Sequence, residues 1–215
     1  MSKVSDHVTN IGFTVVVTGD GFKPALIDPV DLFGGSIDHE RTLVQEDAAC
    51  QFSFHGGKYQ VAIMPNRASV EAMEPVMSGY LVSNVEHLFG ILDKYRGAVS
   101  VSGWGMNCYT TFSLGTTGTE YCRRLMRSVE FDRLINGADS GDVSIWLRGE
   151  AYHSDMKVTV RIEPKVDADG KLLFVSVNGH RDLSGDDMLA PGLESRVASF
   201  NQYVEALHER ITENG

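Results

Sequence analysis

The chain has 215 residues, of which 42% are hydrophobic and 22% are charged, and its formal net charge is −10. A chain of this length and composition can bury a core without disulfides, which argues against a disordered protein. Its 29 acidic residues against 19 basic ones argue against general nucleic-acid binding, because that binding needs a basic surface to displace counterions from phosphates.

The cysteines and the apolar runs indicate where the protein resides. Cys50, Cys108 and Cys122 lack CxxC spacing, which is typical of reduced thiols in the cytoplasm. The N-terminal residues lack an apolar signal segment, and no apolar run approaches the roughly 18 residues that a membrane helix needs. We therefore expect a soluble cytoplasmic protein with no membrane partner.

The first part of the chain predicts a series of strands. Residues 8–18 and 42–54 are rich in strand-forming residues, and a glycine-containing turn at 55–58 joins the second strand to another at 59–64. That last strand could continue past Pro65, with the proline at a bend or a sheet edge.

The best-formed helix in the sequence comes next. Ser83 and Glu86 form a capping box, and Gly97 stands where helices commonly end. Between them, apolar residues recur at intervals of four and three, which gives the helix one apolar face. We expect this face to lie against a sheet.

Residues 99–114 alternate in character and predict the central strand of that sheet. A change in which face is apolar, beside Gly103 and Gly105, predicts a bulge or a sharp twist near Gly103. Because glycine lacks a Cβ atom, the two glycines leave a flat patch that another group can approach closely. That group is either a crossing helix, or a ligand or partner backbone with Asn107 and Trp104 nearby.

The segment 118–137 predicts a helical connection to the second half of the chain. Cys122 and Leu125 are expected on its inward face, whereas Arg123 and Arg127, four residues apart, share another face. These arginines either form solvated ion pairs with the many carboxylates of the protein or bind an anion or an acidic partner.

Three strands and a helix complete the chain. The alternation within 142–151, 157–166 and 171–178 predicts an antiparallel meander of three strands. Residues 193–211 predict a helix whose apolar residues recur at intervals of four and three, as in a heptad seam. This seam either lies on the sheet or forms a helix-to-helix dimer contact.

Together, these elements predict an α+β fold. We expect a single domain, 1–215, with a twisted, mainly antiparallel sheet of about six to seven strands and about two to three amphipathic helices on one face. The halves 8–115 and 142–213 resemble each other in element order, because each has antiparallel strands followed by an amphipathic helix. They share no repeat at the level of residues, so an internal duplication stays a hypothesis.

No motif in the sequence predicts catalysis. Residues 180–183 repeat the HRDL of protein kinases, but Met64 replaces the lysine and Asp187 the asparagine that this chemistry requires. His180, Asp182 and the acidic residues after them could suit a divalent cation, yet they lack the regular ligand spacing of a calcium loop. We therefore expect no metal and no cofactor, and the sequence favours a non-enzymatic protein.

Three hypotheses of function follow. The first is a binding or assembly protein that contacts other proteins, and most of all its own copies, through sheet edges or the C-terminal helix. The second is an enzyme or a small-ligand receptor with a pocket at the central strand. The third is an acidic inhibitor or nucleic-acid mimic, which requires carboxylates gathered on one face. The candidate residues for binding a ligand or partner are Gly103, Trp104, Gly105, Asn107, His180 and Asp182.

Overall fold

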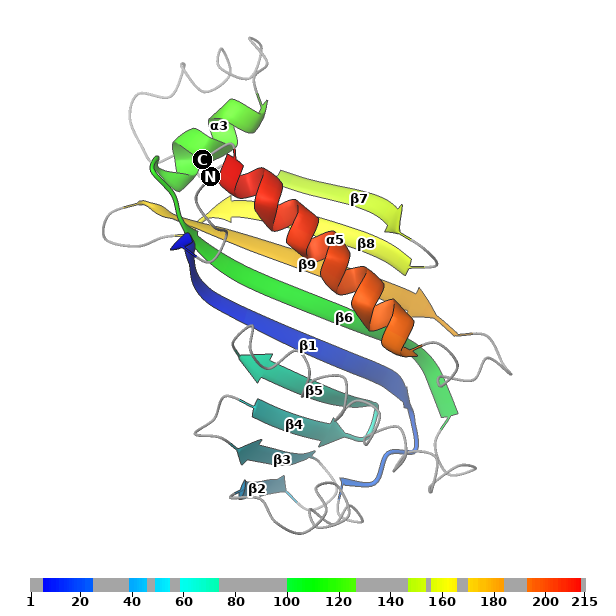
Figure 1. Ribbon diagram of the computed structural model, residues 1–215. Helices are drawn as coiled ribbons and strands as arrows, with labels where there is room; N and C mark the ends of the chain where they lie inside the picture. Colours follow the sequence, from blue (N-terminus) through cyan, green and yellow to red (C-terminus); the bar gives the residue numbers. More distant parts are fainter. Residues whose placement is uncertain are drawn as a thin grey trace, which may run out of the picture.

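The computed structural model describes residues 6–24, 39–45, 49–54, 59–73, 100–126, 147–153, 156–165, 170–183 and 193–213. Within these ranges the chain forms one nine-stranded sheet in which all paired strands are antiparallel (Figure 1). Two helices accompany it. The prediction of a mainly antiparallel α+β fold is confirmed, whereas the predicted strand number was too low.

The strands are β1 (Val8–Asp20), β2 (His39–Gln45), β3 (Ala49–Phe54), β4 (Tyr59–Met64), β5 (Arg67–Met73), β6 (Ser100–Ser113), β7 (Leu147–His153), β8 (Met156–Pro164) and β9 (Leu172–Asp182). The helices are α3 (Gly118–Met126) and α5 (Leu193–Glu213). Across the sheet the strands follow the order β2-β3-β4-β5-β1-β6-β9-β8-β7. The long strand β6 therefore lies inside the sheet, between β1 and β9, as its sequence predicted.

The structure divides one predicted strand in two and confirms the bounds of another, 59–64, as β4. The segment 42–54 contains the end of β2 and all of β3, which pair with each other so that Leu43 lies opposite Cys50. Pro65 and Asn66 form the turn between β4 and β5, instead of a bend within one strand. Proline ends β4 because it has no N–H group to donate to the ladder.

The bulge that the sequence predicted near Gly103 is present. Thr18 of β1 lies opposite Gly103, whereas the next residue, Gly19, lies opposite Val101. Ser102 is therefore an extra residue in β6, which is the arrangement of a β-bulge.

The second half of the sheet is the predicted meander, but β9 is longer than expected. Residues up to Asp182 remain in the strand, although Asn178 and Gly179 resemble a turn in the sequence. They stay extended because they pair with β6 on one side and with β8 on the other, where Gly179 lies opposite Met106 and Val158.

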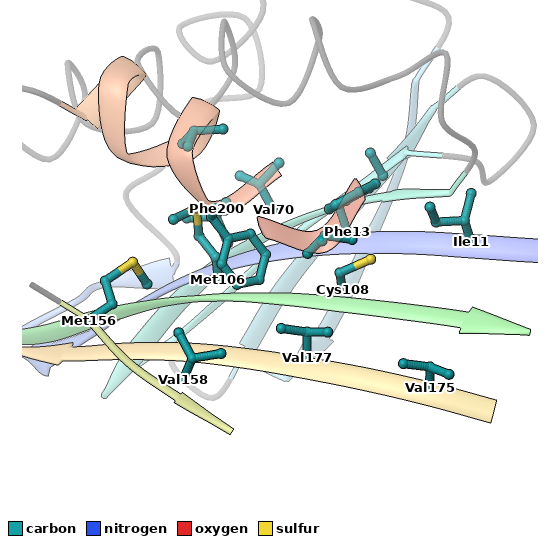
Figure 2. Packing of buried hydrophobic residues seen from close by; sticks show 14 of the residues in the cluster. Ile11, Phe13, Val70, Met106, Cys108, Met156, Val158, Val175, Val177 and Phe200 are labelled. Carbon is teal, nitrogen blue, oxygen red and sulfur yellow. The ribbon is translucent and has the colours of Figure 1, made fainter. Parts of the chain in front are cut away.

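The core lies between α5 and one face of the sheet. In Figure 1, α5 runs across the strands β6, β9 and β8. Figure 2 shows Met106, Val177 and Phe200 among the buried side chains that meet on this side. The buried residues of the α5 seam are Val197, Phe200, Val204 and Ile211. This burial favours packing on the sheet of the same chain over a helix-to-helix dimer contact.

The helix α3 packs its first turns against the end of the sheet. The backbone N–H of Glu120 donates to Thr117 Oγ1 at 3.1 Å, which caps the helix. Tyr121 and Cys122 are buried, but Leu125 is 46% exposed, so its predicted inward position is wrong. An ideal Cβ at Gly118 would lie 2.6 Å from the Leu172 carbonyl oxygen, so contact with the strands is closest at the start of α3.

Several predicted features lie outside the described residues. They are the capped helix at Ser83 and Glu86, the side chain of Arg127, and Asp187 beyond β9. Of the helices that the structure describes, none combines the length and the apolar character that crossing a membrane requires.

Candidate functional site

The two faces of β6 divide the predicted site residues. Gly103, Gly105 and Asn107 lie on the face opposite α5, because Trp104 and the alternate residues after it are buried in the core. Trp104 is therefore not part of the candidate site. Its ring instead lies 5.8 Å from the guanidinium carbon of Arg196 in α5. Successive residues of a strand point to opposite faces, so Trp104 could not share a surface with its glycine neighbours.

The strand β9 brings the other predicted residues to the same face. His180 lies opposite Gly105, and Asp182 lies opposite Gly103. Asn178 lies opposite Asn107, and its side-chain amide donates a hydrogen bond to Asn107 Oδ1. We call the set Gly103, Gly105, Asn107, Asn178, His180 and Asp182 the polar face.

Backbone carbonyl oxygens of β9 lie nearest to the ideal Cβ positions of the two glycines, and the imidazole of His180 lies beside them. An ideal Cβ at Gly103 would lie 3.4 Å from His180 Cε1, and one at Gly105 would lie 3.6 Å from His180 Nδ1. An aromatic ring that covers a glycine on the neighbouring strand protects its bare backbone. We expected that a helix could cross the sheet at Gly103 and Gly105. The described helix α5 does not do so, because it lies on the other side of the sheet.

Within the polar face, Gly103 and Gly105 are buried, whereas the side chains from β9 are exposed. His180 Nε2 lies 2.9 Å from Asp182 Oδ1, and the side chains of the two residues are 45% and 93% exposed. Ser102 Oγ donates to Thr18 Oγ1 at 3.4 Å on the neighbouring strands. Hydrogen-bonded pairs therefore lie side by side across β1, β6 and β9.

The charged part of this face continues to the last strand of the sheet. Lys157 of β8 lies opposite His180, and its Nζ is 2.9 Å from Glu150 Oε2 on β7. Arg148 Nη2 lies 3.0 Å from Glu150 Oε1. The hydrogen bond from Lys157 is the main reason why the pKa of Glu150 is lowered. Acidic and basic side chains alternate here. The hypothesis of an acidic inhibitor or nucleic-acid mimic requires carboxylates gathered on one face, and this arrangement does not favour it.

The edge strand β7 is a site that the sequence did not single out. Its partner among the described strands is β8, and it stands last in the order of the sheet. Arg148, Gly149 and Glu150 are all exposed, and an ideal Cβ at Gly149 would meet no atom within 4 Å. The alternating sequence predicted a strand, but its place at the edge depends on pairings that short-range patterns do not encode.

The buried thiols are unsuited to nucleophilic chemistry. Burial raises the pKa of Cys108 to about 12 and that of Cys122 to about 11. A thiol with so high a pKa holds almost no thiolate at neutral pH, and the thiolate is the reactive form. The interpretation of Cys108 as an inert buried thiol is thus supported.

Two other predicted sites have less support. Arg123 is exposed on α3, but the position of its expected companion Arg127 is not described. Among the described residues, no three His, Cys, Asp or Glu side chains are grouped so that they could hold a metal ion.

Neither the protein-family models nor the curated proteins contain a match to this chain. The geometry of the sheet is therefore the basis for a function. Exposed charges of both signs on β7, β8 and β9 suit contact with another protein, where such groups form the polar rim of an interface.

Proposed function

We propose that this protein is a non-enzymatic assembly protein that forms homo-oligomers through the β7 edge of its sheet. The observation that carries the proposal is the exposure of three consecutive residues, 148–150, in the last strand of the sheet. An edge strand presents unpaired N–H and C=O groups, and these are a template for pairing with a further strand. Main-chain hydrogen bonds then supply the affinity, as in other cases of strand addition.

The polar face supports the same proposal. Small ligands bind in concave sites that bury most of their surface, whereas the side chain of Asp182 is almost fully exposed and that of His180 is about half exposed. The alternative of an enzyme or a small-ligand receptor is supported by the convergence of Asn107 and His180 on one face. The exposure of the side chains from β9 on that face favours a macromolecular partner instead.

A cytoplasmic location belongs to the same proposal. Cys50, Cys108 and Cys122 are buried cysteines outside any disulfide among the described residues. Free thiols persist in a reducing compartment, which is consistent with the absence of CxxC spacing.

Assembly of the full chain should be visible by sedimentation velocity over a wide range of protein concentrations. We expect a dimer or a larger species whose share increases with concentration, because association through one short strand is reversible. A single monomeric species at every concentration would contradict the proposal.

A further inference from the structure

We propose that a second copy of this chain pairs with β7 in antiparallel orientation, in a register centred on Gly149. This inference rests on the proposed function and adds the identity of the partner and the alignment of the two strands. In this register Gly149 lies opposite Gly149 of the second copy. Arg148 then lies opposite Glu150 of the second copy, and twofold symmetry repeats this pair.

The charges of β7 favour this register over the two neighbouring ones. Two antiparallel copies of a strand can be centred on any of its residues, and residues on opposite sides of the centre then face each other. Centring on Arg148 places two guanidinium groups opposite each other, and centring on Glu150 places two carboxylates opposite each other. Like charges at directly opposite positions destabilise a strand pair, and opposite charges stabilise it. Of these three centres, Gly149 joins opposite charges in both pairs.

The two faces of β7 fit the same alignment. Residues opposite each other in an antiparallel pair point to the same face of the sheet. Glu150 lies opposite Thr159, which lies opposite Asn178, so Glu150 belongs to the row of the polar face. Arg148 is two residues away and shares that face. The polar faces of two copies would therefore form one continuous surface.

On the other face of β7, Gly149 leaves space at the twofold axis because it has no side chain. It lies opposite Val160, in the row of the core side of the sheet. No atom lies within 4 Å of its ideal Cβ position, and the residue is exposed. Two glycines at the centre of the pair place no side chains against each other, so the α5 sides of both copies can approach without collision there.

Glu150 can accept a further hydrogen bond from Arg148 of the second copy. Its two carboxylate oxygens already face Lys157 and Arg148 of the same chain. An ionised carboxylate accepts about four hydrogen bonds, so a guanidinium of the second copy can be added without breaking either contact. Charges on an edge strand often prevent pairing. Here their order, basic then acidic on one face, makes the strand complementary to itself.

Two charge reversals test the register, separately and mixed. Arg148→Glu places carboxylates at both positions, 148 and 150, and Glu150→Arg places guanidinium groups at both. Each variant alone should dissociate about tenfold or more readily than the wild type, because both cross-strand pairs become repulsive. A mixture of the two variants should form heterodimers, since every pair then joins opposite charges. Native mass spectrometry distinguishes these species by mass.

The matched controls are Arg124→Glu and Glu120→Arg, which reverse the exposed ion pair of α3. They should assemble like the wild type and show no preference for heterodimers. Circular dichroism checks that each variant is folded, and heterodimer formation itself reports competent folds. The register would be overturned if either β7 variant assembled like the wild type, or if the mixture formed no heterodimers. In both cases the proposed function would still stand, provided that the wild type forms oligomers. A monomeric wild type would overturn both.

Discussion

Replacement of Phe200 by alanine is expected to reduce the free energy of unfolding by about 3 to 5 kcal/mol, the usual range for a buried phenylalanine. Phe200 is buried in the middle of α5, and an ideal Cβ at Gly179 would lie 3.0 Å from its Cε2 atom. The ring therefore rests directly on the backbone of β9. Removing it leaves a cavity between the helix and the sheet.

Urea denaturation at neutral pH measures this loss. The control is Gln202→Ala, an exposed position of the same helix, which should change the stability by less than about 0.5 kcal/mol. If Phe200→Ala costs no more than this control, α5 does not pack on the sheet through this residue.

His208 is expected to make the fold sensitive to mild acid. The residue is 4% exposed on α5, and its Nε2 lies 3.0 Å from Thr110 Oγ1 on β6. Phe112 presents its ring to the imidazole in a T-shaped contact with 5.1 Å between centroids. Burial lowers the pKa of His208 from 6.5 to about 4, because the charged form has lost its hydration.

The sign of the effect follows from the two states. Between pH 6.5 and about 4 the unfolded chain binds a proton at His208 and the folded chain does not. The stability that the neutral imidazole provides is therefore present above pH 6.5 and decreases as the pH falls. Between pH 7 and pH 5 the loss from this group should be about 2 kcal/mol.

Denaturation of the wild type and of His208→Gln at pH 7 and pH 5 measures this contribution. Glutamine keeps a hydrogen-bonding group near Thr110 and does not titrate, so the variant should lose less stability on acidification. Gln202→Ala, at an exposed position of the same helix, should lose as much stability on acidification as the wild type. A variant at position 208 that keeps the full loss would show that other groups cause it.

The central strand and its two faces could be predicted from the sequence because alternation is a local property. The pattern of residues 99–114 located β6, and the pair Gly103 and Gly105 indicated its bulge. The same pattern also excluded Trp104 from the glycine face. Including it among the candidate residues was therefore an error of interpretation.

Pairing between distant strands could not be predicted in the same way. The partner of β6 on one side is β9, which begins more than fifty residues later in the chain. This pairing keeps Asn178 and His180 in a strand, where the local sequence indicates a turn. It also places β7 at the edge of the sheet, and the functional proposal depends on that position. Leu125 illustrates the same limit, since its exposure depends on how α3 meets the sheet.

Hydrogen–deuterium exchange at β7 tests the assembly proposal most directly. Amides of residues 147–153 that point away from β8 exchange freely in an isolated edge strand and are protected when a second strand pairs with them. We expect their exchange to slow as the concentration of the full chain increases, while exposed amides of α3 exchange at a constant rate. Assembly that leaves the exchange of the β7 amides unchanged at every concentration would contradict the claim that β7 is the interface.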